Sequence, residues 1–513
     1  MVSTIETAAI CGMEAVTVHV EVDVSTGLPG FLMVGYPGSE VKEAGERVRV
    51  ALKNAGITIP PMRITVNLSP ADIRKCGTTF DLPIAVGILQ SLGYLEEEQT
   101  EQMMFAGELS LDGRINAIRG VLPMVRKAKM QGSLKCVVPW ENEAEGRLIP
   151  EMDVIGVHSL QEVLQVLQGE ERQLLTKTDI KGKREGGESV AGENKLPIDF
   201  ADINGQMVAK RAAEIAAAGF HNLLMVGPPG SGKTMIAQRI PGILPPLTQE
   251  ESLEVSSVYS ISGLLNQHQA LITARPFMNP HHTITPQALA GGGKHPRPGV
   301  ISLAHKGVLF LDEMPEFRQN VLDMLRQPLE ERKIQIARLG GNYEYPADIM
   351  LVGAMNPCPC GYFPDMSRCK CTQTAIRRYQ SHLSGPILDR IDICAEVPAV
   401  SMEELNAKSK SESSAVIRKR VMRARQRQQE RGAGLSNAAL TKAEIEKYCL
   451  LEPAGERLMQ KVFHSSRLSA RAYYRILRVA RTIADLDGCQ KIGELHIAEA
   501  VSCRLAGSRY WEK

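Results

Sequence analysis

The sequence predicts an α/β protein of three parts: an N-terminal α+β domain, a central domain with a parallel sheet, and a C-terminal helical region. Two short apolar runs, 223–226 and 307–311, predict buried parallel strands, because strands covered by helices on both faces need apolar residues throughout. Long helical patterns at 416–430 and 470–486 place the helical part at the end of the chain.

Composition indicates a multidomain protein without a membrane-spanning segment. The 513 residues are 43% hydrophobic and 23% charged, and this length exceeds what one core usually supports. The formal net charge of +2 neither favours nor excludes nucleic acid, so a binding surface must come from local clusters. No run is long enough to cross a bilayer, and the first residues lack the pattern of a secretory signal. We therefore expect a cytoplasmic protein with no membrane partner.

The N-terminal part, residues 1–167, predicts an independent α+β domain. Residues 16–22 alternate with a period of two, as expected for a strand with one buried face. The chain then becomes polar and rich in glycine, so residues 168–196 predict a flexible linker. The remaining residues divide into a core at 197–398 and a helical region at 399–513.

A phosphate-binding pattern, GxxxxGK[ST], follows the first predicted strand directly. Glycine lets backbone amides approach a polyphosphate, and the positive end of the next helix favours its charge. Lys233 would neutralise the β and γ phosphates, and Thr234 would place its hydroxyl on Mg²⁺. The residues predicted to bind the nucleotide in this loop are Gly227, Pro228, Pro229, Gly230, Ser231, Gly232, Lys233 and Thr234.

Two carboxylates end the second predicted strand. Asp312 and Glu313 follow the run 307–311, at the edge where ligands of parallel sheets bind. Asp312 is expected to reach the Mg²⁺ ion, and Glu313 is expected to polarise the attacking water. Together with Lys233, these carboxylates predict hydrolysis of ATP.

A wider set of motifs resembles the AAA+ ATPases. Asn356 follows a third apolar strand at 349–355, and the motif Leu-Asp-Arg-Ile-Asp occupies 388–392. Two further segments, 275–282 and 291–305, are similar to the magnesium-chelatase-like group, the ComM/YifB family. The resemblance covers nearly the whole chain and implies a homo-hexameric ring that binds ATP and Mg²⁺, with a helical lid resembling the C-terminal part of magnesium chelatase.

The resemblance also implies roles for individual side chains. Asn356 would be sensor 1, whose amide orients the water near the γ-phosphate. Arg390 would be the arginine finger, supplied to a neighbouring subunit, so the site would be complete only in a ring. Arg471 matches the sensor 2 arginine of the lid, with an ion-paired or solvated arginine as the alternative. The expected catalytic residues are Glu313, Asn356, Arg390 and Arg471, and residues 199–206 resemble the segment that lies against adenine.

Two insertions distinguish this group from simpler AAA+ proteins, and the resemblance places both at the ring channel. The helix-2 insert spans about 280–298, in a glycine-rich loop whose charges are otherwise expected to be solvated. Two alternating arms about a Gly-Gly-Asn turn predict a β-hairpin over 334–345. The candidate contacts to a polyanion or other substrate are Lys294, His295, Arg297 and Arg338.

Four of the eleven cysteines form two closely spaced pairs after Asn356. Four thiolates in this arrangement can meet one tetrahedral Zn²⁺ and would hold together a loop with few apolar residues. Ordinary reduced thiols are the alternative, because CxC is less common at zinc sites than CxxC. The predicted ligands of a structural zinc are Cys358, Cys360, Cys369 and Cys371.

The N-terminal domain resembles the Lon protease domain, for example at residues 105–114. That protease uses a serine–lysine dyad, whereas the matching positions here carry Thr79 and Leu122. Leucine cannot act as a base, so we expect a non-proteolytic domain that helps assembly or substrate contact. Lys75 and Arg74 are candidate phosphate contacts, with surface solvation as the alternative.

The predicted function is that of a ring ATPase that moves on DNA. The resemblance implies a branch-migration helicase in recombination or transformation, acting on single-stranded or branched DNA. The dense basic helix at 417–427 fits a phosphate backbone and fits a solvated helix surface equally well. The alternative function is a chelatase-type ATPase that remodels a protein partner. The chain has no DxSxS metal motif, so it would then be the ATPase component alone.

Overall fold

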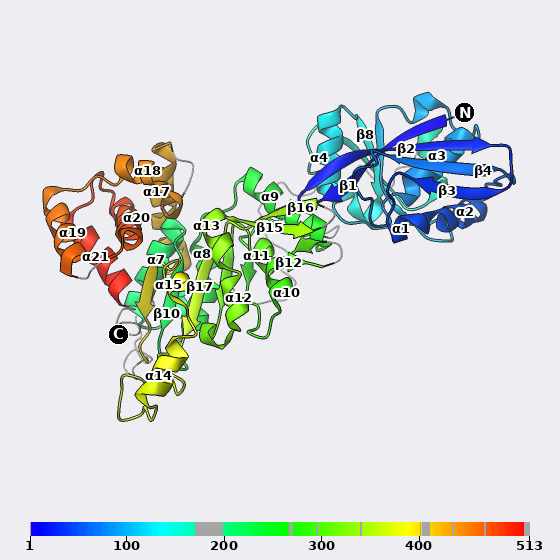
Figure 1. Ribbon diagram of the computed structural model, residues 1–513. Helices are drawn as coiled ribbons and strands as arrows, with labels where there is room; N and C mark the ends of the chain where they lie inside the picture. The colour runs from blue at the N-terminus through cyan, green and yellow to red at the C-terminus, as the bar shows by residue number, and fades with distance from the viewer. Residues whose placement is uncertain are drawn as a thin grey trace.

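The computed structural model divides along the chain into an N-terminal domain, a central core and a C-terminal helical region (Figure 1). It describes residues 2–169, 198–265, 270–293, 296–338, 341–400, 402, 411–432, 436–465 and 468–506. The predicted linker beyond residue 169 and the candidate contacts Lys294 and His295 lie outside these ranges. The predicted α/β class is confirmed, with sheets in the first two parts and helices in the third.

A seven-stranded mixed sheet, ordered β3-β4-β2-β1-β5-β8-β9, forms the N-terminal domain. The period of two is confirmed on β2, where Val18, Val20 and Val22 are buried. The strands are β1 (Val2–Cys11), β2 (Glu14–Ser25), β3 (Gly30–Val34), β4 (Arg63–Ser69), β5 (Met103–Phe105), β8 (Lys135–Pro139) and β9 (Asp153–Val157), with a small pair β6 (Glu108–Leu109) and β7 (Ile115–Asn116). The helices are α1 (Ser39–Lys42), α2 (Ala44–Asn54), α3 (Asp81–Ser91), α4 (Val121–Gln131), α5 (Glu143–Gly146) and α6 (Leu160–Leu167).

A parallel five-stranded sheet, ordered β11-β14-β17-β10-β18, forms the centre of the core. Its strands are β10 (Leu223–Val226), β11 (Phe277–Met278), β14 (Val308–Leu311), β17 (Met350–Met355) and β18 (Ile393–Glu396). Leu223 and Met225 belong to the apolar cluster on one face, and Leu224 and Val226 belong to the cluster on the other. Both faces are therefore covered, which explains why these strands are apolar at every position.

Helices and two small hairpins surround this sheet. The helices of the core are α7 (Met207–Gly219), α8 (Lys233–Ile243), α9 (Gln249–Ser262), α10 (Pro286–Ala290), α11 (Val300–Leu303), α12 (Gln319–Asp323), α13 (Arg326–Glu331), α14 (Gln373–Gln380) and α15 (Gly385–Leu388). The hairpins are β12 (Gly291–Gly292) with β13 (Arg297–Pro298), and β15 (Lys333–Arg338) with β16 (Gly341–Pro346). The antiparallel pairing of β15 and β16 confirms the hairpin predicted over 334–345.

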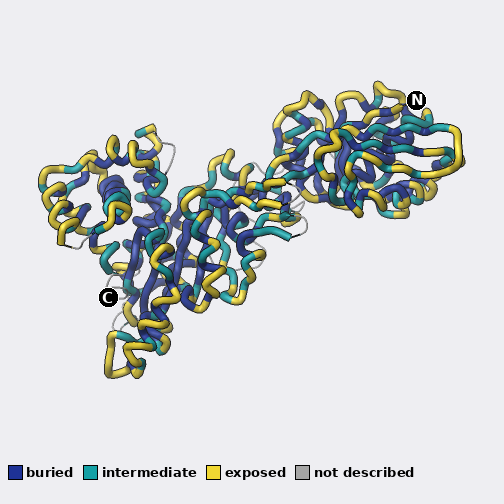
Figure 2. Tube along the Cα trace, viewed as in Figure 1, coloured by how far each residue is buried: buried dark blue, intermediate teal, exposed yellow. Residues whose placement is uncertain are grey.

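The helical region consists of α17 (Ser414–Glu430), α18 (Lys442–Tyr448), α19 (Pro453–Ser465), α20 (Ala470–Asp487) and α21 (Glu494–Leu505). Helices α17 and α20 share one apolar cluster with α7 and α8, so the lid and the core are packed together. Figure 2 shows this continuity as buried segments that run from the sheet into the lid. No helix in the described part of the chain is long and apolar enough to cross a membrane.

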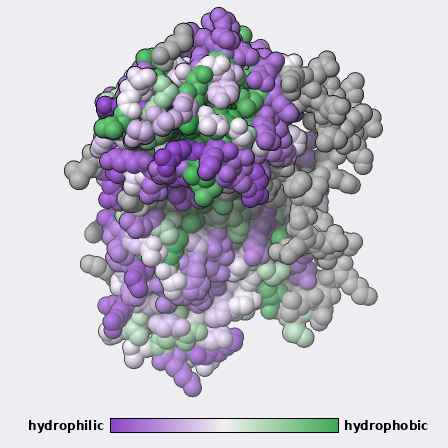
Figure 3. All heavy atoms as spheres, turned by 90° about the vertical axis from the view of Figure 1, so that its right-hand side faces the viewer, coloured by the Kyte–Doolittle hydropathy of each residue, from purple (hydrophilic) through white to green (hydrophobic). Residues whose placement is uncertain are grey.

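The N-terminal domain contacts the core through α4 and α9. The amide of Gly120 donates to the carbonyl of Ser260 at 3.1 Å, and the Ser260 hydroxyl donates to the buried carboxylate of Glu145. Figure 3 views the molecule from the side of the N-terminal domain and shows mainly hydrophilic residues, interrupted by small hydrophobic patches. Buried polar contacts therefore join the two domains.

Candidate nucleotide-binding site

The glycine loop 227–232 connects β10 to the first turn of α8. A Cβ atom at Gly227 would lie 2.0 Å from the carbonyl oxygen of Val397, so only glycine fits there. Gly230 and Gly232 have φ angles of +72° and +91°, which are left-handed conformations that glycine adopts without a steric cost. The loop thus has the close backbone turn that a phosphate-binding loop requires.

Lys233 lies at the centre of this site and is only 8% exposed. Its ammonium donates to the carbonyls of Gly227 at 2.7 Å and Pro228 at 2.8 Å, and to Oδ1 of Asn356 at 3.2 Å. Burial lowers the pKa of Lys233 to about 8, against the opposing effect of Asp312 and Glu313. The structure therefore brings Asn356, the predicted sensor 1, into contact with the predicted phosphate lysine.

Thr234 and Asp312 lie side by side at the edge of the sheet. The Thr234 hydroxyl donates to Oδ2 of Asp312 at 2.7 Å. A hydroxyl and a carboxylate at this spacing are oxygen ligands of the kind that Mg²⁺ prefers. Glu313 is exposed next to them and has a φ of +50°, an uncommon conformation that turns the chain out of the strand. Both carboxylates thus lie beside the glycine loop, as predicted.

A large apolar cavity of about 1,100 Å³ opens next to Gly227 and Pro228. Of residues 199–206, the segment predicted to lie against adenine, only Gln206 lines this cavity. Its Nε2 donates to the carbonyls of Ser231 at 3.1 Å and Pro398 at 2.6 Å. An aromatic base fits an apolar cavity beside a phosphate loop. Sequence reasoning missed most of this wall, because its members come from distant segments: Met207, Val208, Phe363, Pro364, Val397, Ser502 and Cys503.

Arg390 lies at the opposite end of the sheet from the glycine loop. Its carbonyl accepts from Nδ2 of Asn222, the residue that precedes β10, at 2.8 Å. Its guanidinium pairs with Glu330 at 2.6 Å and donates to the carbonyl of Arg326 at 3.0 Å. The structure therefore does not bring Arg390 to Lys233 of the same chain.

Arg471 lies in the first turn of α20, on the same side of the core as Arg390. It lines a hollow of about 320 Å³ together with Glu330, Lys442 and Arg475. A second, smaller hollow lies beside Arg390. Several residues line both hollows, among them Arg475. Neither hollow includes a residue of the glycine loop. The two predicted arginines are thus near each other and remote from the ATP site of their own chain.

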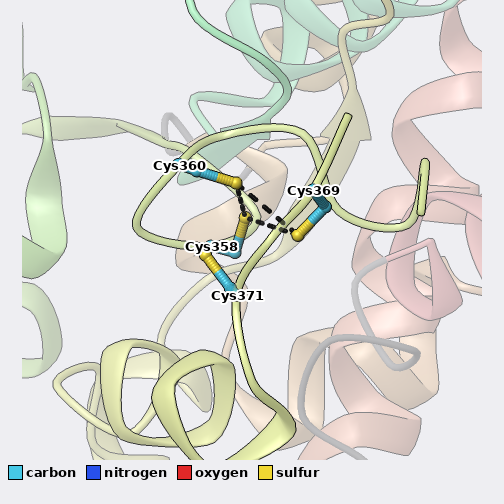
Figure 4. Close-up of side chains that lie close together, drawn as sticks. All are labelled: Cys358, Cys360, Cys369 and Cys371. Atoms are coloured by element: carbon cyan, nitrogen blue, oxygen red, sulfur yellow. Dashed lines mark hydrogen bonds between the residues drawn. The ribbon is translucent and has the colours of Figure 1, made fainter. Parts of the chain in front are cut away.

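The four cysteines predicted to bind zinc converge in one loop after β17 (Figure 4). Their sulfur atoms all lie within 4.8 Å of one another, and three of the separations are 3.4, 3.5 and 3.8 Å. Four sulfurs at about 2.3 Å from one tetrahedral zinc are spaced by about 3.8 Å. The donor set and its spacing therefore fit a closed zinc site made by Cys358, Cys360, Cys369 and Cys371.

The cysteine loop packs directly against the glycine loop. A Cβ atom at Gly361 would lie 2.4 Å from Cδ of Pro229, and Nε2 of Gln380 donates to the carbonyl of Pro357 at 2.9 Å. Phe363 in the same loop lines the large apolar cavity. The loop that gathers the cysteines is thus also a wall of the candidate nucleotide site.

The basic helix α17 uses much of its charge in contacts within the protein. Arg420 pairs with Glu214 of α7 at 2.5 Å and with Glu412 at 2.7 Å. Lys419 and Arg423 are exposed on the same helix. The helix therefore joins the lid to the core, which favours the structural alternative over a long phosphate-binding face.

Lys75 is not available for phosphate contact, which corrects one expectation. It is fully buried, and its ammonium donates to the carbonyls of Gly35 at 3.0 Å and of Pro70. Leu122 is also buried, with its backbone amide bonded to Glu145 at 2.8 Å. Thr79 lines a cavity, yet neither Lys75 nor Leu122 can act as its base.

The two insertions contact each other. The hydroxyl of Tyr345 donates to the carbonyl of Pro296 at 2.8 Å, which ties β16 to the helix-2 insert. Nη2 of Arg338 lies 3.6 Å from the Cβ position of Gly292. Arg297 and Arg338 are both exposed, so the two insertions present positive charge close together.

Comparison with known proteins places these motifs in one family. The protein-family model described as "Magnesium chelatase, subunit ChlI" matches residues 199–405. The family model of the C-terminal part of the same subunit matches residues 411–504. The model "Subunit ChlI of Mg-chelatase" matches residues 20–142. Together these matches cover most of the chain.

Whole-length relatives agree with the family models. The chain is 44% identical to competence protein ComM of Haemophilus influenzae over 97% of this chain and 96% of ComM. It is 42% identical to YifB of Escherichia coli over 98% and 97% of the two chains. Its N-terminal part is 32% identical to Lon protease 2 of Bacillus subtilis over 127 residues, 25% of this chain and 22% of that protease. The chain belongs to the magnesium-chelatase-like ComM/YifB family of AAA+ ATPases, a family membership that implies ATP and Mg²⁺ as its ligands.

Proposed function

We propose that this protein is an ATP-hydrolysing ring motor that acts on DNA as a branch-migration helicase. The observation that carries the proposal is the separation of the catalytic parts within one chain. Lys233 and Asp312 lie at one end of the sheet, whereas Arg390 and Arg471 lie at the other. A ring in which each chain offers its arginines to the next would bring the two sets together.

The chemistry at the first set follows from its geometry. Lys233 would bind the β and γ phosphates, and Thr234 and Asp312 would hold Mg²⁺, which would neutralise phosphate charge there. Glu313 positions the attacking water, and Asn356 orients it from the neighbouring strand β17. The apolar cavity beside Gly227 takes the adenine base.

The arginines supply positive charge from the neighbouring subunit. As the bond to the γ-phosphoryl group breaks, charge develops on its oxygens, and a guanidinium placed there lowers the barrier. Asn222 connects this end of the sheet to the strands of the ATP site. Its Oδ1 accepts from the Leu351 amide at 2.9 Å, and its Nδ2 holds the Arg390 carbonyl. The turnover rate would thus depend on assembly of a homo-hexameric ring.

DNA as the substrate is supported by the name of a close relative and by surface charge. The relative is a competence protein, 44% identical over nearly the full length. The exposed Arg297 and Arg338 lie on adjacent insertions that would face the channel. Clustered positive charge of this kind binds phosphates.

The zinc ion proposed at the four cysteines has a structural role. The four cysteine sulfurs would supply all the ligands that a tetrahedral zinc takes, so the ion would have no open position for water or substrate. The ion would hold Gly361 and Phe363 against the glycine loop and the base cavity. We therefore expect zinc loss to disturb the ATP site without removing the phosphate loop.

ATP turnover measured with and without DNA tests this function. Single-stranded, duplex and four-way-junction DNA should each be compared with no DNA, and we expect the largest stimulation with single-stranded or branched DNA. The same DNA should be displaced or branch-migrated only when ATP is hydrolysed. Turnover that no DNA changes would contradict the proposal and favour the alternative, a chelatase-type motor that remodels a protein partner.

A further inference from the structure

We propose that the junction between the N-terminal domain and the hairpin β15–β16 binds single-stranded nucleic acid. The proposal rests on the function proposed above, because it adds a second contact for the same nucleic acid. Two tyrosines and four arginines from both domains form the site, which we name the junction surface: Tyr36, Arg74, Arg119, Arg297, Arg338 and Tyr343. The N-terminal domain then takes part in holding the strand.

Tyr36 is the most unusual residue of this surface. Its φ is +60°, a left-handed conformation that costs free energy for a large side chain. Its side chain is 53% exposed, so packing offsets little of that cost. An exposed aromatic ring held in a strained conformation is explained when a ligand uses the ring.

The buried Lys75 holds Tyr36 and Arg74 in place. Its ammonium binds the carbonyl of Gly35, next to Tyr36, and the carbonyl of Pro70, on the loop that leads to Arg74. The backbone amide of Lys75 donates to the carbonyl of Tyr36 at 3.2 Å. Two loops are thereby fixed together, and Arg74, the residue before Lys75, is exposed. This arrangement gives the buried lysine a positioning role.

The hairpin brings Tyr343 to the same place. The turn between β1 and β2 touches β16, where a Cβ atom at Gly12 would lie 3.5 Å from the carbonyl oxygen of Glu344. The same Cβ atom would lie 3.8 Å from Cα of Tyr343. Burial raises the pKa of Tyr343, and the charges of Cys11, Cys76, Arg74 and Tyr36 also act on it. Tyr343 pairs with Ile336, two residues from Arg338, so Tyr343 and Arg338 share one face of the hairpin.

The four arginines lack acidic partners within the described residues. Most arginines of the lid, by contrast, are in ion pairs or bind carbonyls. Arg119 and Arg297 line one cavity of about 490 Å³ that extends from Cys76. Burial and the charge of Arg297 both lower the pKa of Arg119, which shows that two like charges lie close together. An anion between them would remove this repulsion.

Charge and aromatic rings together favour a single strand. The exposed Tyr36 can stack on an unpaired base beside the half-buried Tyr343, whereas the bases of a duplex are already stacked on each other. Arginines on the same surface bind the phosphates. Glu344, at the hairpin contact, is paired with Lys333 at 3.0 Å. Glu40 and Glu108 line the cavity of Arg119 and Arg297 without an ion pair to either arginine within the described residues. The geometry thus matches a stacking platform with a positively charged border.

The test compares binding of a fluorescent oligo-dT by the wild-type protein and a Tyr36→Ala/Arg74→Ala variant, at several salt concentrations. Loss of one stacked base should weaken binding by about tenfold. Loss of one phosphate contact should also reduce the slope of log K against log salt by about 0.7. Tyr36→Ala alone should weaken binding without changing the slope, and Tyr36→Phe should bind like the wild type.

Two controls separate binding from folding. Arg63→Ala/Tyr94→Ala removes an exposed arginine and an exposed tyrosine from the same domain, away from the junction, and should bind like the wild type. Arg63 is the first residue of strand β4, which pairs with β3. The loop that carries Arg74 follows the other end of β4. Tyr36→Gly relieves the strained conformation, so its unfolding temperature should not fall while its binding weakens.

The outcomes also separate this proposal from the proposed function. Wild-type protein that binds and is stimulated by oligo-dT, with a junction variant that binds equally well, would overturn the junction surface alone. If Tyr36→Ala lost affinity for oligo-dT and for duplex DNA equally, the role of base stacking would be overturned. A wild-type protein that neither binds DNA nor responds to it would overturn both the surface and the DNA motor.

Discussion

Lys233 and Glu313 have different tasks, although they follow the same phosphate loop and strand edge. The Lys233 ammonium is fixed by two loop carbonyls and by Asn356. Glu313 is exposed and free of such a network within the described residues, as a residue that meets water should be. The proposed function therefore assigns phosphate binding to Lys233 and the chemical step to Glu313.

Substitution should separate these two tasks. Glu313→Gln should retain ATP binding and lower turnover by at least about a hundredfold, because a positioned base is lost. Lys233→Ala should weaken ATP binding by about tenfold or more and also abolish turnover. Binding of a fluorescent ATP analogue and release of phosphate are the two measurements. Equal hydrolysis by the wild type and Glu313→Gln would refute the role of the glutamate.

The proton of Lys233 gives a pH dependence of ATP binding. Burial lowers its pKa to about 8, so the ammonium is present below that pH and is lost as the pH rises through it. A neutral amine attracts phosphate less, so the affinity for ATP should be constant below pH 7 and should fall between pH 8 and 9.5.

The control for this pH dependence is Lys233→Arg, whose guanidinium does not lose its proton in this range. Its affinity for ATP, whatever its absolute value, should not fall between pH 8 and 9.5. Isothermal titration with an ATP analogue at each pH measures both proteins. A wild-type affinity that is flat over this range would show that Lys233 does not control it.

At the scale of elements, the cysteine loop and the glycine loop act as one unit. The cysteines gather the chain after β17, and Gly361 within that loop touches Pro229. A zinc ion bound by the cysteines would therefore help to position atoms of the glycine loop. This contact makes two predictions, one for the metal and one for the contact itself.

The first of these predictions concerns the metal. Cys369→Ser/Cys371→Ser should reduce the zinc content from one ion per chain to almost none, because two of four ligands are lost. Turnover should fall by about tenfold while nucleotide binding persists, since the phosphate loop follows a different strand. Elemental analysis of the purified protein is the measurement. Wild-type protein without zinc, which takes up none when refolded with it, would return the cysteines to ordinary thiols.

The second concerns the contact. Gly361→Ala places a methyl group 2.4 Å from Cδ of Pro229 and also opposes a φ of +84°. We expect weaker ATP binding with the zinc retained, which is the reverse of the cysteine variants. Gly385→Ala has no atom within 4 Å of its Cβ position and serves as the control. Unchanged ATP affinity in Gly361→Ala would show that the two loops are independent.

Local sequence patterns predicted the elements whose formation depends on neighbours in the chain. The glycine loop, the acidic strand end and the hairpin β15–β16 each follow from residues within about twelve positions. The cysteine cluster was visible for the same reason. Lys75 was misjudged because one of its partners, Gly35, is 40 residues away. From the local sequence alone, a buried lysine that donates to backbone carbonyls cannot be distinguished from a lysine exposed to solvent.

The position of Arg471 shows a second limit of sequence reasoning. Its place depends on how α20 packs against α7, about 260 residues earlier in the chain, and no local pattern encodes that contact. The charges of α17 were ambiguous for a similar reason, because Glu214 lies on α7. Burial and pairing between distant elements decide the role of such residues.

At the scale of the whole molecule, the two ends of the core sheet have different tasks. The carboxyl end carries the ATP site, and the amino end carries Arg390 and the hollow lined by Arg471. The lid also holds the loop of Arg390, since Arg475 donates to the carbonyl of Ile391 at 3.4 Å. In the proposed ring, lid movement in one chain would thus move the arginine that we propose acts on the next chain.

Mixing two inactive variants tests this central claim most directly. Arg390→Ala keeps its own ATP site and lacks the finger, whereas Glu313→Gln keeps the finger and lacks the water-positioning carboxylate. Each variant alone should hydrolyse ATP slowly. After subunit exchange, some interfaces pair an intact site with an intact arginine, so the mixture should regain part of the wild-type turnover. Full turnover by Arg390→Ala alone, or no recovery in rings shown to contain both variants, would contradict the shared site.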